Sequence, residues 1–172
     1  MIPNAIAQLI ATPTPPGLGP ERREDVWPLE ECQLEIDQAL KSCGIDPPAA
    51  NLICAAILLW HDHLDPSHTI SQSIKTPDGS YLHALMHRRE PDYPNAKYWL
   101  RQTGKHEAFE EISNRSHAIL VDSRLSHLAN DQWDPFAVVD AVSNVGSDEN
   151  ESALLVRVQE IEFEVLLERF CD

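Results

Sequence analysis

The stretch PPAANLICAAILLWHDH, residues 47–63, decides the fold. Its two prolines suit the first turn of a helix, where a missing N–H costs nothing, and apolar side chains then cover nearly every face as far as Trp60. A helix that is apolar all round is buried, so we expect a central core helix here. The longest apolar run, from Ile53 to Trp60, has eight residues, far fewer than the roughly 20 of a membrane-spanning helix.

Amphipathic segments are expected on both sides of this core helix. Before it, apolar residues recur with a helical period over 29–43, and Gly44 suits the end of that helix. After it we expect a short helix from an Asp65-Pro66 cap to Ile74, and then a turn at 76–79 with a positive φ at Asp78-Gly79. Further helices are expected over 80–90, 96–104, 106–120 and 147–170, with a short one after the Asp134-Pro135 cap.

The fold class that follows is all-α: a single-domain irregular helical bundle of about six to eight helices. A terminal strand within residues 156–165, where apolar residues partly alternate, is the minority alternative. Residues 1–28 are expected to form an N-terminal extension with a proline-rich surface strap, since 13–28 hold five of the 13 prolines. Residues 29–172 form the single helical domain.

Charge and composition exclude several classes of function. The 172 residues include 13 Lys and Arg against 28 Asp and Glu, a formal net charge of −15. Binding to nucleic acid or to anionic lipid needs the opposite sign, so neither a nucleic-acid nor a membrane partner is expected. The first residues lack the basic region of a signal peptide, which favours a soluble cytoplasmic protein with four free cysteines. The acidic C-terminal helix is a candidate homodimer surface.

Histidines gather in the middle of the chain. Five of the eight, His61, His63, His68, His83 and His87, fall within 55–105, a window with six basic and five acidic side chains in an otherwise strongly acidic chain. In a helix over 80–90, His83, His87 and Glu90 share one face.

This spacing predicts a divalent metal site of His83, His87 and Glu90, with His68 or His61 as a further ligand, for zinc, iron, manganese or nickel. Alternatively, His68, His83 and His87 act as acid and base near neutral pH. The structural alternative is that His83 or His87 caps a helix end or binds a carbonyl in the core.

Cationic and aromatic side chains follow the histidines. Arg88, Arg89 and Arg101 are candidates for holding an anionic small molecule, because guanidinium groups bind carboxylate or phosphate bidentately. Arg88 and Arg89 could instead pair with Glu90, Asp92 or the C-terminal helix. Two further candidates are Asn95, at a helix start, and Trp99, as one wall of a pocket or simply as a core aromatic residue.

The segments HDHLDPSHTISQ (61–72) and HALMHRREPDYPNAKYWLRQTGKH (83–106) resemble an uncharacterised family of bacterial and fungal proteins with the pattern HGIMHRRE-D--NA-YW-R--G-HP. The resemblance covers about residues 60–106 and implies membership of this family, without indicating which activity it has. It implies that His106 is also a site residue. The chain departs from the pattern at Ala84 and Leu85, where the family has Gly-Ile, and at Glu107, where it has proline. The matching positions are His68, His83, His87, Arg88, Arg89, Glu90, Asp92, Asn95, Trp99, Arg101 and His106.

Two functions remain open on the sequence. In the first, residues 61–106 form a His- and Arg-rich pocket that binds a divalent metal, an anionic small molecule, or both. In the second, the protein is a non-catalytic interaction or structural module, and the segment His87–Glu90 (HRRE) belongs to an internal salt-bridge network. The phosphate-binding loop and the G-x-S-x-G motif are both absent from the sequence.

Overall fold

The computed structural model describes residues 1–130 and 132–172, and within these ranges the chain is helical, without strands. The all-α prediction is therefore confirmed, and the minority strand alternative is wrong because residues 156–165 lie inside the last helix. The elements are α1 (Asn4–Leu9), α2 (Leu29–Cys43), α3 (Ala49–Trp60), α4 (Leu64–Ser71), α5 (Pro77–Arg89), α6 (Tyr93–Thr103), α7 (Ala108–Leu120), the 3-10 helix η1 (Ser126–Leu128), α8 (Pro135–Asn144) and α9 (Glu149–Cys171).

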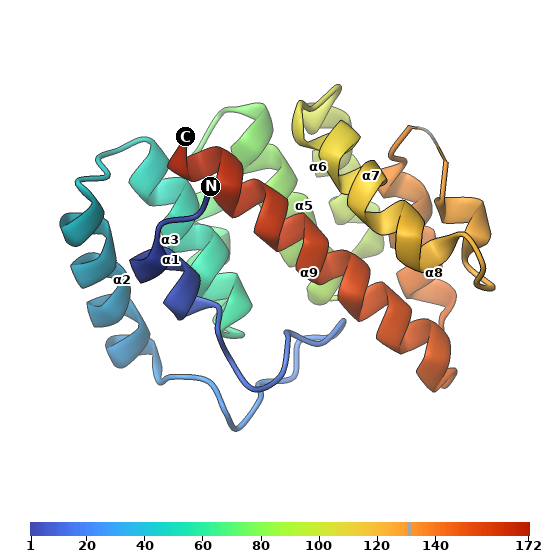
Figure 1. The fold of residues 1–172 in the computed structure, drawn as a ribbon, viewed down its shortest axis with the longest axis horizontal. Coiled ribbons are helices and arrows are strands. Elements are labelled where there is room, and N and C mark those ends of the chain that lie inside the picture. Colours follow the sequence, from blue (N-terminus) through green and yellow to red (C-terminus); the bar gives the residue numbers. More distant parts are fainter. Residues whose placement is uncertain (131) are drawn as a thin grey trace.

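Helix α9 crosses the front of the bundle, with α3 and α5 behind it (Figure 1). It packs on α3 and α7, while α4 and α6 flank α5 and α8 adjoins α6. Helices α1 and α2 cover one end of the molecule. The two termini meet, and the amino group of Met1 lies 3.1 Å from Asp172 Oδ1.

The core helix lies where the apolar pattern predicts it. In α3 every residue from Ala55 to Trp60 is buried, and it contacts α2, α4, α5 and α9. Helix α2 also has the predicted bounds, because Gly44 adopts a left-handed conformation (φ 64°) that ends it. At both places a local sequence signal predicts the helix correctly: the apolar pattern in α3 and the helix-ending glycine after α2.

The predicted turn at 76–79 is wrong, since these residues begin α5. Thr76 Oγ1 accepts a hydrogen bond from the Gly79 backbone N–H at 3.2 Å, and Pro77 occupies the first turn. Gly79 is helical and has no positive φ. A Cβ there would lie 2.4 Å from the Ile74 carbonyl oxygen, so a close approach of α5 to the preceding chain requires glycine.

Other helix starts also differ from the sequence prediction, and one helix was not predicted. Helix α4 begins at Leu64, so Asp65 lies inside its first turn and is not the cap. Helix α7 begins at Ala108, two residues after His106. Helix α1, which the sequence prediction omits, forms because Ile6 and Leu9 are buried where α1 packs on α2.

The segment between α1 and α2, residues 10–28, has no helix and follows the surface of the bundle. It is anchored to the core by polar contacts, among them the Gln159 amide, which donates to the carbonyls of Pro16 and Gly17 at 3.0 Å. Trp27 stacks on the His61 ring with centroids 4.7 Å apart. We call this segment the strap.

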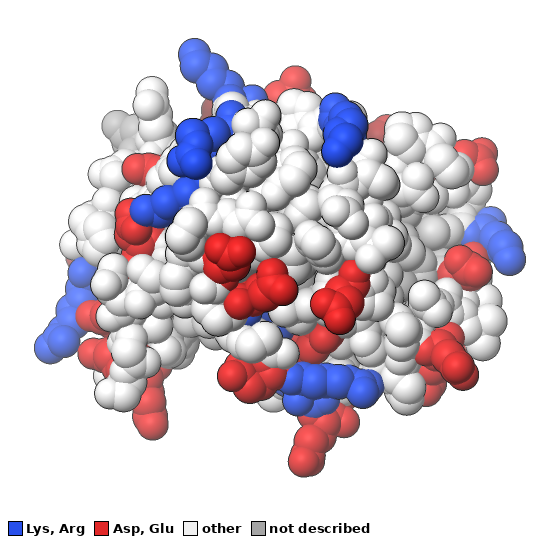
Figure 2. Space-filling view, turned by 180° about the vertical axis from the view of Figure 1, so that it is seen from behind, with Lys and Arg blue, Asp and Glu red and all other residues white. Residues whose placement is uncertain are grey.

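Charged side chains are unevenly spread over the surface. Figure 2 shows a row of acidic side chains across the middle of the rear face, below a broad area with few charges. None of the helices in the described ranges combines the length and apolar character that crossing a membrane requires.

Candidate functional site

Helix α5 distributes the polar residues of HALMHRRE over several of its faces. His83 and His87 are one turn apart, so their rings stack, with centroids 4.7 Å apart and planes 17° from parallel. Arg88 and Arg89 follow at steps of about 100° around the helix and meet different neighbours. All four side chains are buried, so α5 carries buried polar groups next to its buried apolar residues.

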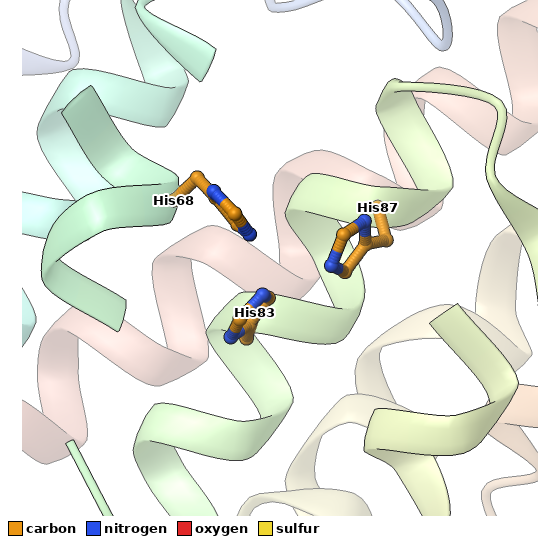
Figure 3. A group of neighbouring side chains, drawn as sticks. All are labelled: His68, His83 and His87. Atoms are coloured by element: carbon orange, nitrogen blue, oxygen red, sulfur yellow. The ribbon is translucent and has the colours of Figure 1, made fainter. Parts of the chain in front are cut away.

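A third histidine completes a cluster on this helix. His68 of α4 lies with its ring centroid 4.7 Å from that of His83 and 5.2 Å from that of His87. The rings of His68 and His87 each point a nitrogen toward the space beside His83 (Figure 3). One nitrogen of each ring lies within 4.8 Å of the other two, so the three groups are close enough to hold one metal ion. We call His68, His83 and His87 the histidine triad.

His83 is the most unusual member of the triad. It is 1% exposed, and among the described residues neither of its ring nitrogens has a hydrogen-bond partner. Its other face stacks on Trp99 of α6, at a centroid distance of 4.1 Å. Burial, with smaller effects from His87, His68 and Lys75, lowers the pKa of His83 to about 3. The ring is therefore neutral at pH 7, which is the state that binds metal.

His87 is oriented by a carboxylate. Its Nδ1 lies 3.0 Å from Glu90 Oε2, so Nδ1–H donates to Glu90 and Nε2 keeps its lone pair. The Asn95 amide nitrogen lies 3.1 Å from Nε2 and 3.5 Å from Nδ1. An atom in line with the Nε2 lone pair would be much farther from Nδ1, so Asn95 lies over the face of the ring and leaves Nε2 open.

Burial lowers the pKa of His87, although its hydrogen bond to Glu90 opposes this effect. The sequence prediction treats Glu90 as a direct ligand together with the histidines. In the structure Glu90 is half exposed and lies 3.0 Å from His87 Nδ1. It does not belong to the triad, but with His87 and Asp92 it forms a second group whose ligand atoms lie within 4.8 Å of one another. For an ion held by the triad, Glu90 would support a metal-bound histidine without touching the ion.

Arg88 faces away from the triad and pairs with the last helix. Its Nη2 lies 2.5 Å from Glu162 Oε2, with both side chains at most 2% exposed. Tyr81 donates its hydroxyl hydrogen to Glu162 Oε1 at 2.6 Å, and Trp133 Nε1 donates to the Tyr81 oxygen at 3.1 Å. Burial alone would lower the pKa of Arg88, but Glu162 outweighs it and raises that pKa.

Arg89 forms a second internal pair. Its Nη2 lies 2.7 Å from Asp62 Oδ1, and both side chains are fully buried. Asp62 also accepts from Arg23 Nε at 2.8 Å, so the pair ties the strap to α5. Arg89 further donates to the Leu59 carbonyl at 2.6 Å and to the Gly19 carbonyl at 3.1 Å. The expectation that Arg88 and Arg89 hold an anionic ligand does not fit, because buried carboxylates already neutralise both.

Two other predicted site residues lie apart from the triad. His106 receives a hydrogen bond from the Ala108 N–H at Nδ1 (3.2 Å) and donates Nε2–H to Asp78 (3.1 Å), so both ring nitrogens have internal partners. Arg169 pairs with the same Asp78 carboxylate at 2.7 Å. Arg101 is exposed on α6, and it takes part in none of the ion pairs found among the described residues.

The remaining histidines of the sequence cluster hold the strap. His61 donates Nε2–H to the Leu9 carbonyl at 2.7 Å, and His63 donates Nε2–H to the Trp27 carbonyl at 3.0 Å. Burial lowers the pKa of both rings. His61 is therefore not a further metal ligand as the sequence prediction allowed, because its ring is committed to α1 and the strap.

Three important residues were missed from the sequence. Glu162 carried a signal, since it lies four residues after Val158 on the apolar stripe of α9, where a carboxylate needs a buried partner. No sequence signal marked Asp62, because its partners Arg89 and Arg23 come from α5 and from the strap. Lys75 has its ammonium nitrogen 5.9 Å from the Trp99 ring centroid, a contact set by the fold.

No family model matches this chain, and neither curated proteins nor solved structures gave a significant match.

An open cavity of about 770 Å³ lies beside His106, Phe109 and Trp133. The described residues that line it do not include the histidine triad. The site must therefore be interpreted from its own chemistry.

Proposed function

We propose that the histidine triad binds one divalent transition-metal ion, with zinc the best fit. Three neutral imidazoles are ligands that suit zinc, nickel and iron better than they suit manganese, which prefers oxygen. The observation that carries the proposal is His83, a buried ring without a hydrogen-bond partner among the described residues beside two more imidazoles. A buried polar group without a partner is costly, and a metal ion would satisfy it.

The distances support a shared ion. A Zn–N bond is about 2.1 Å, which puts two nitrogens of a tetrahedral site roughly 3.4 Å apart. The triad nitrogens lie within 4.8 Å of one another before any ion is bound, and small rotations of the rings would close this difference. Glu90 would fix the tautomer of His87 that offers Nε2 to the ion.

Three protein ligands would leave a coordination position for water or another ligand, which is typical of catalytic rather than structural zinc. A zinc-bound water loses a proton near neutral pH, and this is the chemistry that the ion would supply. The chain's own residues would exclude water from one side through Trp99 and orient His87 through Glu90. The pairs Arg88–Glu162 and Arg89–Asp62 support the structural alternative for the HRRE segment, which is compatible with a metal at the triad.

The test is zinc binding to protein without a histidine tag, stripped with chelator and titrated in a calorimeter. We expect one ion per chain and a rise in the thermal midpoint, because an ion that binds only the folded state stabilises it. His68→Ala should lower the affinity more than about 100-fold, since a lost ligand should cost more than the loss of an outer-shell partner.

His68 is partly exposed, so this variant should keep its fold, which circular dichroism verifies. The matched controls are His117→Ala and His127→Ala, since both residues are exposed and lie outside the triad. Absence of stoichiometric binding, or equal binding by His68→Ala, would overturn the proposal.

A further inference from the structure

The two sides of the triad differ in charge. On one side Glu90 lies 3.0 Å from His87 Nδ1, and Asp92 belongs to the same group. On the other side Trp99 covers His83, and the Lys75 ammonium lies above the Trp99 ring. Lys75 is exposed and donates to the Gln72 carbonyl at 2.7 Å, and it has no carboxylate partner among the described residues.

The triad and the residues around it are unequally exposed. His83 and His87 are 1% and 4% exposed, whereas His68 and Trp99 are partly exposed. Lys75 acts on this side of the site, because its charge contributes to lowering the pKa of His83. This side, which we call the rim, is thus cationic and aromatic, whereas the carboxylates of Glu90 and Asp92 lie beside His87.

Charge balance then favours an anion at the open position. This step rests on the proposed function. Three neutral imidazoles would leave the charge of a divalent ion uncompensated within its ligand shell, because Glu90 and Asp92 are not among the three ligands. A second positive charge at Lys75 adds to this field.

We propose that the ion in the triad takes a small oxyanion, a carboxylate or a phosphate, as its further ligand, and that Lys75 provides the second contact. The anion-binding group of this protein is then the lysine at the rim, in place of the arginines that the sequence suggested. Trp99 positions it, because an ammonium above an indole ring is held by the ring's negative face.

The test uses protein loaded with Co²⁺, whose visible absorption reports on the ligands of the ion. Inorganic phosphate and sodium acetate are titrated separately, with sodium chloride at equal ionic strength as the reference. We expect a saturable spectral change with phosphate, acetate or both, and the effective titrant names the source. Lys75→Met should raise the dissociation constant about fivefold, the upper range for an exposed ion pair, while Lys41→Met on α2 should leave it unchanged.

The outcomes separate this inference from the proposed function. Cobalt binding without a response to either oxyanion overturns the inference and leaves the metal site standing. An equal response in Lys75→Met overturns the role of Lys75. Failure to bind either cobalt or zinc overturns both proposals.

Discussion

The two polar faces of α5 differ in how their buried groups are satisfied. On the arginine face the Nη2 atoms of Arg88 and Arg89 meet buried carboxylates at 2.5 and 2.7 Å, although their Nε atoms have no hydrogen-bond partner among the described residues. On the other face His83 is equally buried but has unpartnered ring nitrogens among the described residues. Buried polar groups therefore serve two purposes in this one helix. The arginines join helices, and the histidines are left available for a ligand.

The largest effect is expected from breaking the arginine face. Arg88→Met leaves the Glu162 carboxylate buried without its cation, which should lower the free energy of unfolding by about 3–5 kcal/mol. Urea denaturation measures this loss in the free energy of unfolding. The double variant Arg88→Met/Glu162→Met should recover most of the loss, since paired apolar side chains avoid the uncompensated charge.

Arg115→Met is the surface control for this comparison. Its side chain is 32% exposed and pairs with Glu111 and Glu168, so the loss should be about 1 kcal/mol or less. Equal losses in Arg88→Met and Arg115→Met would show that the buried pair is not a special feature of the fold.

A smaller effect is expected on the histidine face from Glu90→Ala. Removing the acceptor of His87 Nδ1–H frees the ring and its tautomer, so zinc affinity should fall about 10- to 100-fold. Glu90→Gln should restore part of it, because its amide oxygen still accepts from Nδ1–H. Glu110→Ala on α7, also an exposed glutamate, is the control in the same zinc titration. Unchanged affinity in Glu90→Ala would mean that His87 needs no outer partner.

The histidine face should also make the metal-free protein sensitive to mild acid. The pKa of His83 is about 3 in the folded state and about 6.5 in an unfolded chain, so the unfolded state binds the additional proton. Stability is therefore complete above pH 6.5 and falls as the pH drops below it, by about 1 kcal/mol between pH 7.5 and 5.5. Urea midpoints at the two pH values measure this loss, and His83→Asn should reduce it. An equal loss in His83→Asn would assign the sensitivity to other groups.

Helices were predictable from the sequence wherever a local signal marked them. Gly44 ends α2 at the predicted residue, and the all-apolar pattern identifies α3. The start of α5 was misread because Thr76-Pro77-Asp78-Gly79 contains residues that serve a turn and a helix cap equally well. Only the tight packing of Gly79 against Ile74 distinguishes the two.

The candidate site was predictable only where its residues share a helix. His83 and His87 are four positions apart, so their common face follows from the helical period. His68 joins them through the packing of α4 on α5, and its place depends on the fold. For Arg88 the alternative of pairing with the C-terminal helix is confirmed by Glu162 on α9. Asp62, the partner of Arg89, lies before α4 and beyond the reach of spacing rules.

The smallest effect is expected at Arg101, the one predicted arginine that lies on the surface. Because it is exposed and belongs to neither face of α5, Arg101→Ala should change the free energy of unfolding by less than about 0.5 kcal/mol. The Arg101→Ala variant should bind zinc with the affinity of the parent protein. In the cobalt-loaded form it should bind phosphate more tightly than Lys75→Met does. If Arg101→Ala instead weakens phosphate binding as much as Lys75→Met, the rim of the site extends along α6 and the oxyanion contacts both cations. Measuring the two variants side by side therefore locates the anion on the lysine side or between the two residues.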